Sequence, residues 1–585
     1  MKILLIAVNA KYIHSNPAVY SLRAYAQSFL DAQRGEGEDD RELCKDAGVE
    51  IRPEILVAEY TINQQMDEIL RDIYRQAPDM LCFSCYIWNI SCIERTVREI
   101  HKVLPQTVIW LGGPEVSYDA ETVLDRLPEV FGIMKGEGEE TFAHVAAGAP
   151  YKEIPGITYR NEKGEICENP WREVMDLDKV PFIYQDMTDF EHRIVYYESS
   201  RGCPFHCSYC LSSVDKELRF RSLELVKREL KFFIDHEVPQ VKFVDRTFNC
   251  SHQHAMAVWR YIMEQDRGIT NFHFEIAADL LNEEELELIS RMRPGLIQLE
   301  IGVQSVNPET IKEIHRTMQF EKVAANVRRI RQMGNVHQHL DLIAGLPYED
   351  FDSFQRSFNE VYALSPEQLQ LGFLKVLKGS LMGENRERYG LVYQSGPPYE
   401  VLYTRWLSYG DVLRLKGVEE MVELYYNSGQ FTKTLPILEE GFTDAFTLYM
   451  RLAGYYERHG LHLVNHARAA RYEILLGFGS EAFPEKTEQI RELLTYDYYL
   501  RENAKSRPAF AGEYRIKKEE LREFFERESR EHKYLPGYEQ YDRNQMRKMT
   551  HLECFEKLGK TVLFDYSRRS PLNQQVRTVI IANWR

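Results

Sequence analysis

Three cysteines, Cys203, Cys207 and Cys210, follow one another at x3 and x2 spacing. Three neighbouring thiolates can hold three irons of a cubane iron-sulfur cluster, whereas an electron-carrier cluster normally has four cysteine ligands. The fourth iron is then open to a substrate, so the spacing predicts a reaction centre. The alternative is a zinc loop completed by His206, although zinc sites favour paired C-x2-4-C units and no second pair lies nearby in the sequence.

The loop resembles the signature of the radical S-adenosylmethionine (SAM) superfamily, in which an aromatic residue precedes the third cysteine, as Tyr209 does here. The resemblance implies that the three cysteines hold a 4Fe-4S cluster. Its open iron would take the amino and carboxylate groups of SAM. Reduction of the cluster by a flavodoxin- or ferredoxin-type partner would then cleave SAM to methionine and a 5'-deoxyadenosyl radical.

The elements that must position this loop alternate between strand and helix. Strands are predicted at 194–198, 241–245, 272–277, 296–301, 337–343 and 370–376. Helix-length segments separate them, which predicts a partial (βα)6 TIM-like barrel with its chemistry at the carboxyl-terminal rim. Because the cysteine loop follows the first strand, we expect it at that rim.

A second set of residues resembles the barrel of oxygen-independent coproporphyrinogen oxidase and its relatives, where the matching side chains surround SAM. The set is Glu275 in the third strand, Gln304 after the fourth, Arg316 twelve residues later, Asp341 in the fifth and, as a looser match, Asp245 at the end of the second. Arg316 offers a fork of donors for the methionine carboxylate. Asp341 can accept from both ribose hydroxyls, and Glu275 and Gln304 can meet ammonium and hydroxyl groups. Taken singly, each could be a solvated rim residue.

The first 150 residues show a doubly wound pattern. Apolar runs at 2–8, 55–57, 80–84, 107–111 and 130–134 alternate with helix-length segments, which predicts a parallel Rossmann-like sheet. Ligands of such sheets bind at the carboxyl ends of the strands. Ser84, Gly112, Gly113, Gly136 and Glu137 stand at those ends.

This order resembles the cobalamin-binding domain of cobalamin-dependent enzymes, in which a Ser and a Gly-Gly pair cradle the nucleotide tail. The family pattern Asp-x-His-x-x-Gly, whose His ligates cobalt from below, is replaced here by Lys11, Ile13 and Asn16. The resemblance therefore implies cobalamin bound with its base off. His14 could be an unorthodox ligand or a capping or core histidine, and the domain could also be an α/β module that binds no corrin.

Three further cysteines, Cys82, Cys85 and Cys92, could be taken for a second cluster. Cys82 and Cys85 lie on or at the end of one strand, three positions apart, so their side chains should point to opposite faces. We therefore interpret them as buried thiols.

Composition and charge indicate which partners and which cellular location to expect. The chain has 585 residues and a formal net charge of −17, which disfavours a nucleic-acid partner because Lys and Arg supply most of that affinity. The sequence contains no run of 18 uncharged apolar residues, so no membrane span is indicated. The cysteine usage is typical of a reducing compartment. We expect a cytoplasmic protein. The acidic stretch 34–48 is predicted to be an exposed insertion.

These patterns divide the chain into a Rossmann-like domain (1–150), a linker (151–189), the barrel (190–380) and a mostly α-helical C-terminal domain (381–585). The last part resembles an uncharacterised extension of one subgroup of cobalamin-binding radical SAM proteins. We expect it to close the barrel mouth and to select the substrate.

The resemblances together imply a cobalamin-dependent radical SAM enzyme, with methyl transfer to an unactivated carbon or a phosphinate-like centre as the leading hypothesis. A radical cyclase, oxidase or rearrangement enzyme without methyl transfer is the first alternative, and a non-catalytic cobalamin or redox sensor is the second. The substrate is a small molecule or peptide that the residues do not identify, and no acid-base residue can be named.

Overall fold

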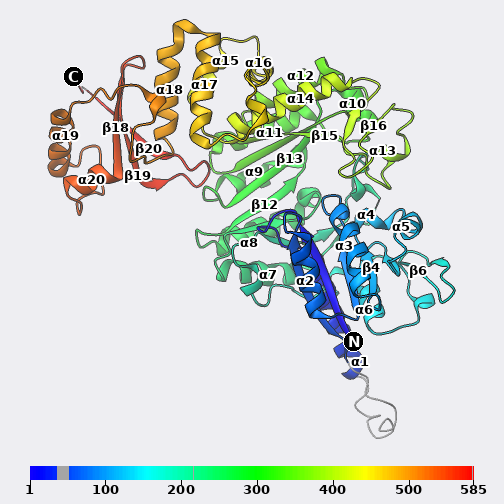
Figure 1. The fold of residues 1–585 in the computed structure, drawn as a ribbon. Helices are drawn as coiled ribbons and strands as arrows, with labels where there is room; N and C mark the ends of the chain where they lie inside the picture. The colour runs from blue at the N-terminus through cyan, green and yellow to red at the C-terminus, as the bar shows by residue number, and fades with distance from the viewer. Residues whose placement is uncertain (36–51, 215–216, 583, 585) are drawn as a thin grey trace. The chain divides into compact units, whose positions relative to one another are not determined.

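The computed structural model describes residues 1–35, 52–214, 217–582 and 584. The predicted acidic insertion lies, from residue 36 onward, outside the described residues. Figure 1 shows the helices and strands of the described residues, and the chain divides into two compact units. The first comprises Met1–Arg291, Ile311–Met318 and Phe373–Arg405, and the second comprises Met292–Thr310, Gln319–Gly372 and Trp406–Arg585.

The first unit begins with the predicted parallel sheet. Its strands are β1 (Lys2–Asn9), β2 (Glu54–Thr61), β3 (Met80–Ser84), β4 (Val108–Gly112) and β5 (Gly132–Met134), and their order in the sheet is β2-β1-β3-β4-β5. The apolar run from Ile3 to Val8 is fully buried in β1, as expected for a central strand covered on both faces. All five predicted strands are therefore present.

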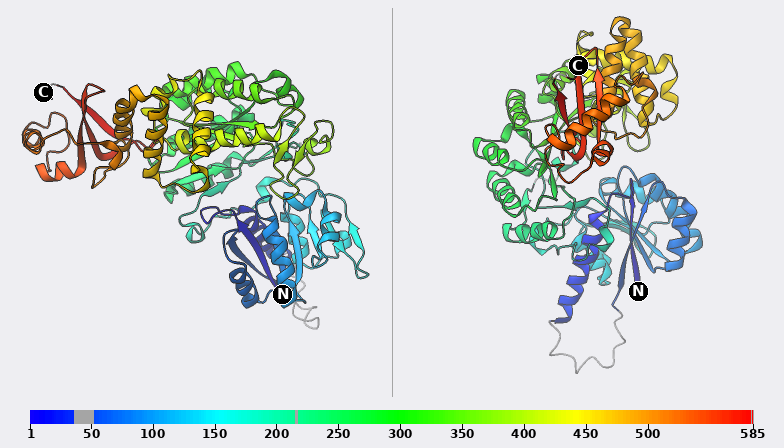
Figure 2. Two further views of the ribbon diagram at one scale, coloured as in Figure 1. Left: turned by 45° about the horizontal axis from the view of Figure 1, so that its top comes forward. Right: turned by 90° about the vertical axis from the view of Figure 1, so that its left-hand side faces the viewer.

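Helices cover both faces of this sheet (Figure 2). Helices α1 (Pro17–Gly35) and α6 (Glu139–Ala146) pack together, as do α2 (Met66–Gln76) and α3 (Ile90–Val103). The α3 helix buries an apolar stripe at three- and four-residue spacing that faces the core, namely Ile90, Ile93, Val97 and Ile100.

The predicted linker differs from expectation in its first half. Strands β6 (Ile157–Arg160) and β7 (Ile166–Glu168) continue the sheet beyond β5 in antiparallel pairing. This part of the linker therefore extends the N-terminal sheet. Both strands are short and bounded by turns, so their sequence carries little periodic signal.

All six predicted barrel strands form. They are β8 (Val195–Tyr197), β11 (Gln240–Phe243), β12 (Asn271–Ile276), β13 (Ile297–Gln304), β14 (His337–Ala344) and β15 (Gln368–Phe373), in sheet order β15-β14-β13-β12-β11-β8. In β12, Phe272, Phe274 and Ile276 are buried, whereas β13 alternates buried apolar residues with half-buried Gln298, Glu300, Gly302 and Gln304.

The segment after β15 belongs to the first unit, although the predicted boundary at residue 380 assigns most of it to the C-terminal domain. The Lys378 ammonium pairs with Glu115 at 3.2 Å and with Asp119 at 3.0 Å, and the Tyr399 hydroxyl hydrogen-bonds to Glu115. These contacts hold residues 373–405 against the N-terminal sheet domain.

The C-terminal part is helical as predicted, with α14 (Tyr409–Met421), α16 (Ala445–Arg458), α17 (Arg468–Ala482) and α18 (Thr487–Tyr499) among its helices. It ends, however, in a three-stranded antiparallel sheet that the sequence did not predict, formed by β18 (Thr550–Phe555), β19 (Lys560–Arg569) and β20 (Val576–Ile581).

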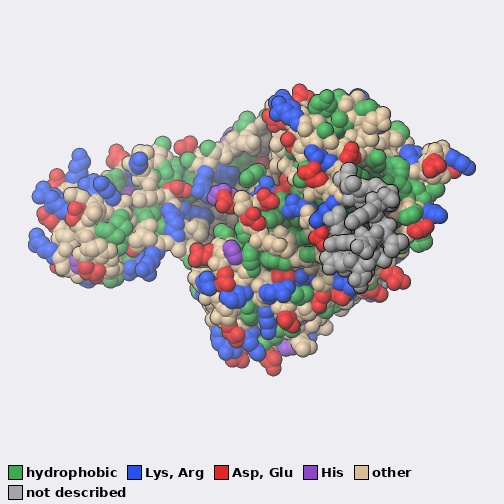
Figure 3. Space-filling view, turned by 90° about the horizontal axis from the view of Figure 1, so that it is seen from below, with side chains coloured by type: hydrophobic (Ala, Val, Ile, Leu, Met, Phe, Trp, Pro, Cys, Tyr) green, Lys and Arg blue, Asp and Glu red, His purple; other side chains and the backbone are tan. Residues whose placement is uncertain are grey.

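None of the helices in the described ranges combines the length and the apolar character that crossing a bilayer requires. On the face shown in Figure 3, acidic and basic side chains are interspersed.

Candidate functional site

The cysteine loop is closed at its base by a short antiparallel ribbon. Strand β9 (Ser200–Arg201) pairs with β10 (Arg219–Phe220), and Arg201 lies directly opposite Arg219. Gly202 follows with a φ of +90°, and a Cβ added there would lie 2.4 Å from the Glu217 carbonyl oxygen. Only glycine therefore allows the chain to leave the ribbon and enter the loop at this point.

The three thiols of the loop are suited to a cluster. Cys203 and Cys207 are buried and Cys210 is half-buried, whereas His206 is exposed. Three sulfur donors on one loop match the donor set of a three-cysteine cluster. The exposed imidazole gives little support to a zinc site completed by His206.

The middle of the loop is fixed by backbone hydrogen bonds. The Ser208 N–H donates to the Ile314 carbonyl at 2.9 Å, and the Met382 N–H donates to the Ser208 carbonyl at 2.8 Å. The loop is thus held between two segments that come from far along the chain.

Arg316, the predicted ligand of the SAM carboxylate, lies next to the loop. Its Nη1 atom is 3.3 Å from the Tyr209 hydroxyl and 3.7 Å from Cys207 Sγ. A guanidinium in this position places fixed positive charge beside the cysteines that would hold the cluster. The structure therefore brings together Arg316, Tyr209 and Cys207, as a shared role requires.

Asp245 occupies a different environment from the one expected of a SAM contact. Its carboxylate is fully buried and accepts hydrogen bonds from the Ser199 N–H at 2.9 Å and from the Ser199 and Ser200 hydroxyls at 2.6 Å each. Ser199 also contacts His254 Nε2 at 2.9 Å. Asp245 thus holds the chain between β8 and the cysteine loop, and contact with SAM remains only a prediction.

In the second unit, Gln304 is the last residue of β13, and Asp341 lies in the neighbouring strand β14, opposite Gly302. Gln304 has a φ of +72° at a bulge between Gly302 and Gln304, a conformation that costs a non-glycine residue about 1 to 3 kcal/mol. Within the described part of the chain its Oε1 atom is buried without a hydrogen-bond partner. Such an acceptor fits a ligand hydroxyl or ammonium group.

Two residues beside Asp341 were missed by the sequence analysis. His339 Nε2 lies 3.0 Å from Asp341 Oδ1, and a nitrogen or oxygen of His339, Asp341 and Glu300 all lie within 4.8 Å of one another. His339 can therefore orient the Asp341 carboxylate. The signal was present as polar residues at alternate positions of β13 and β14, which mark one face of each strand. Glu275 lies half-buried in β12 of the first unit.

The predicted corrin-binding residues lie at the ends of β3, β4 and β5. Ser84 accepts a hydrogen bond from Asn16 Nδ2 at 3.3 Å, and the Cys85 N–H donates to the Gly112 carbonyl at 2.7 Å. Gly113 has a φ of +105°, and a Cβ there would lie 2.5 Å from the Cys85 carbonyl oxygen. The glycines leave a backbone edge without side chains, which fits the close approach of a nucleotide tail.

His14 is already engaged elsewhere. Its Nδ1 atom is 2.6 Å from the Tyr196 hydroxyl, and the Ile194 N–H donates to the Ile13 carbonyl at 2.8 Å. Burial lowers the pKa of His14, and Lys11 lowers it further. The loop that lacks the cobalt-ligating motif is thus tied to the start of β8, which favours a structural role for His14.

Both carboxylate oxygens of Glu137 already accept hydrogen bonds. Oε1 lies 2.7 Å from Arg219 Nη2, and Oε2 accepts from the Met175 N–H at 3.0 Å and from Arg219 Nη1 at 3.1 Å. These contacts give Glu137 a role in joining chain segments, whereas contact of Glu137 or Gly136 with a corrin remains a prediction.

The extra thiols are buried as expected. Cys82 is 7% exposed and Cys85 is fully buried, and burial raises the pKa of both thiols well above the ordinary range. Cys92 is half-buried and its thiol pKa is raised by the same cause. Cys82 and Cys85 therefore lie within the N-terminal sheet domain as buried thiols, in agreement with the interpretation made from the sequence.

The C-terminal part contains a polar cavity of about 510 Å³. The charged side chains that line the cavity largely pair with one another, because Arg507 pairs with Glu553 at 2.7 Å and Arg515 pairs with Glu492 at 3.3 Å. This arrangement does not indicate a particular ligand.

Comparison with known families divides the chain into three matched segments. Residues 41–146 match the B12 binding domain, 197–361 match the Radical SAM superfamily, and 387–580 match a protein family of unknown function, DUF4080. The matches confirm the expected order of domain types.

Individual proteins are similar to about half of the chain. The cobalamin-dependent radical SAM methyltransferase TokK of Streptomyces tokunonensis is 25% identical over 54% of this chain, which spans 50% of TokK. An anaerobic magnesium-protoporphyrin IX monomethyl ester cyclase of Rubrivivax gelatinosus is 22% identical over 54% of this chain and 59% of the cyclase. The chain thus spans about half the length of these curated relatives.

A solved structure, the cobalamin-dependent S-adenosylmethionine radical enzyme OxsB with aqua-cobalamin and S-adenosylmethionine bound, superposes with a TM-score of 0.57. At 14% identity, over 85% of this chain and 78% of OxsB, the likeness shows a shared fold.

Proposed function

We infer that this chain, a cobalamin-binding radical SAM protein with a C-terminal extension, is an enzyme that transfers a methyl group to an unactivated carbon or a phosphinate-like centre. The observation that carries the proposal is the presence in one chain of a B12 binding domain and of a radical SAM domain whose first loop contains Cys203, Cys207 and Cys210. The substrate is a small molecule or a peptide.

In this proposal, residues of the chain bind and orient the cofactors. When bound, the 4Fe-4S cluster and SAM would supply a 5'-deoxyadenosyl radical, and the corrin would supply the methyl group. Arg316 would bind the SAM carboxylate beside Cys207, at the position that its guanidinium already occupies. Gln304 and Asp341 would accept hydrogen bonds from hydroxyl or ammonium groups of SAM.

A cyclisation or oxidation by the same radical is the second candidate. The similarity to the Rubrivivax cyclase supports it, since that relative matches as much of this chain as TokK does. The two candidates differ in whether the methyl group of SAM is transferred to the corrin.

The test needs no substrate. The full chain is reconstituted anaerobically with iron and sulfide and titrated with hydroxocobalamin, and the visible spectrum of the corrin is recorded. Reduced protein is then incubated with SAM, and S-adenosylhomocysteine and 5'-deoxyadenosine are quantified.

A base-off corrin spectrum together with formation of S-adenosylhomocysteine is the result expected of the methyltransferase. Release of 5'-deoxyadenosine alone would favour the cyclase or oxidase. A corrin that binds while SAM stays intact would favour the non-catalytic sensor, and both enzymatic proposals would then be rejected.

Three further expectations remain predictions. They are the flavodoxin- or ferredoxin-type reductant, the absence of a nucleic-acid partner and the cytoplasmic location. Selection of the substrate by the C-terminal part is also a proposal, and its test by truncation should retain residues 373–405, because these belong to the first unit.

A further inference from the structure

Two arginines face each other at the base of the cysteine loop. Arg201 and Arg219 are directly opposite in the antiparallel ribbon that closes the loop. Like charges at directly opposite positions of a strand pair repel each other. Both side chains are largely buried, with 19% and 15% exposure, so solvent screens this repulsion only weakly. The ribbon therefore needs negative charge from elsewhere.

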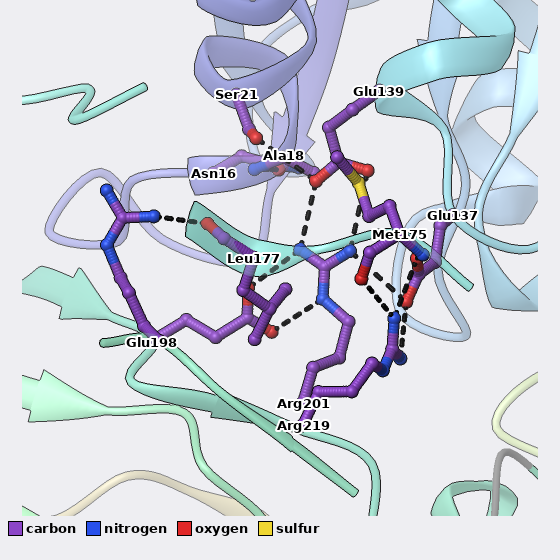
Figure 4. Close-up of polar contacts among 11 residues, drawn as sticks. Asn16, Ala18, Ser21, Glu137, Glu139, Met175, Leu177, Glu198, Arg201 and Arg219 are labelled. Carbon is purple, nitrogen blue, oxygen red and sulfur yellow. Dashed lines mark hydrogen bonds and ion pairs between the residues drawn. The ribbon is translucent and has the colours of Figure 1, made fainter. Parts of the chain in front are cut away.

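That charge comes from the loop between β5 and α6 and from the first residue of α6, in the N-terminal domain (Figure 4). Glu137 lies between the two arginines, with Oε1 2.7 Å from Arg219 Nη2 and 3.4 Å from Arg201 Nη1. Glu139 pairs with Arg201 Nη2 at 2.9 Å and also accepts a hydrogen bond from the Ser21 hydroxyl at 3.1 Å. Both glutamates thus bridge the two domains within the first unit.

The barrel contributes a carboxylate of its own to Arg201. Glu198 meets Arg201 with two hydrogen bonds, from Nε at 3.0 Å and from Nη2 at 2.7 Å. Arg219 is 15% exposed, and two of its nitrogens contact Glu137, Nη2 at 2.7 Å and Nη1 at 3.1 Å. Removing the charge of Glu137 would therefore take a carboxylate away from both arginines of a ribbon in which the two cations face each other.

We propose that Glu137 and Glu139 are positioning residues that act through Arg219 and Arg201 to hold the cysteine loop at a fixed place relative to the N-terminal domain. The inference rests on the proposed function, because the loop holds the cluster and the same segment, 136–139, stands at the strand end where a corrin is expected. The four charges would set the separation of cluster and cobalt.

The direct test measures that separation in the full chain loaded with cluster and cobalamin. Both centres are reduced to paramagnetic states, and the magnetic interaction between the cluster and Co(II) is read from the EPR spectrum. The variant is Glu137→Gln, which removes charge and keeps shape. The matched control is Glu140→Gln, a neighbour on α6 whose ion pair with Arg172, at 3.1 Å, does not involve the ribbon.

We expect Glu137→Gln to weaken or broaden the cluster–Co(II) interaction and to lose iron to a chelator about tenfold faster than wild type, the effect typical of a lost supporting contact at a metal site. Glu140→Gln should match wild type in both measurements.

The inference is overturned if Glu137→Gln and Glu140→Gln give the same EPR spectrum and the same rate of iron loss. Equal changes in both variants, accompanied by equal falls in Tm, would also overturn it, because they would indicate a general loss of stability. Wild-type protein that takes up no cluster or no corrin would instead reject the proposed function, and this inference with it.

Discussion

Two buried carboxylates support the two halves of the barrel, and they do so with different donors. In the first unit, Asp245 accepts from one backbone N–H and two serine hydroxyls just before the cysteine loop. In the second unit, Glu349 accepts from the Ser305 hydroxyl at 2.6 Å and the Ser357 hydroxyl at 2.9 Å, both at Oε1. Ser305 directly follows Gln304. Each carboxylate therefore fixes the backbone next to a predicted cofactor-binding residue.

The hydrogen-bond donors around Asp245 and Glu349 differ in how firmly they hold the carboxylate. Burial raises the pKa of Asp245 to about 6 and that of Glu349 to about 7, and the serine hydrogen bonds oppose the rise in both cases. Asp245 has a backbone donor, which cannot rotate to another acceptor. Glu349 has only hydroxyl donors, and its Oε2 atom has no hydrogen-bond partner among the described residues. We conclude that the support beside the cysteine loop is the more rigid and the more fully ionised of the two.

The largest effect is expected for Asp245→Ala. This change leaves the Ser199 N–H and two hydroxyls without their buried acceptor, so the free energy of unfolding should fall by about 4 kcal/mol. Urea unfolding measures the loss, and the iron content after reconstitution should fall with it. Asp235→Ala, at a more exposed site in the same half of the barrel, is the control. A loss under about 1 kcal/mol for Asp245→Ala would contradict the comparison.

A smaller effect is expected for Glu349→Gln. The amide oxygen can still accept from both serine hydroxyls, while the new NH2 group occupies the place of the unpartnered oxygen. We expect a loss of about 1 kcal/mol in urea unfolding at pH 6. If this variant lost as much stability as Asp245→Ala, hydroxyl donors would be no more adaptable than the backbone donor.

The smallest effect is a difference in pH dependence. Folding raises the pKa of Glu349 from 4.5 to about 7, so its stabilising contribution is complete below pH 4.5 and is lost as the pH rises through 7. Between pH 6 and 8 this loss should amount to about 1 kcal/mol, and Asp245, which titrates near 6, should contribute only about a few tenths. Wild type should therefore lose more stability over this interval than Glu349→Gln. Parallel curves would show that Glu349 does not titrate there.

The strands were predictable because their signal is local. Buried runs such as Ile3 to Val8 and the alternating strand at 337–343 carry their pattern within a few residues. The short strands β6 and β7 carry too little pattern to be recognised, and β18 to β20 follow a long helical stretch whose periodicity dominated the interpretation. The cluster cysteines could be predicted because their spacing is a motif. Arg316 could be predicted because it stands at a fixed distance in sequence from Gln304.

Contacts between distant segments could not be predicted in this way. Arg219 and Glu137 are 82 residues apart, and neither stands in a pattern that names its partner. The same holds for Asp245, whose type matched a ligand contact while its partners are the serines that precede the loop. A carboxylate's role depends on which donors folding brings to it, and the sequence of a single chain does not list them.

The ribbon formed by Arg201 and Arg219 also bears on how metal could enter. Joining the ends of a flexible segment as long as 202–218 costs an unfolded chain roughly 2 to 3 kcal/mol of entropy. In this fold the pairing of Arg201 with Arg219 joins the two ends, so this entropy is already lost when the chain folds. Iron would thus bind to a loop whose ends are already joined, so a cluster could be lost and rebuilt while the protein stays folded.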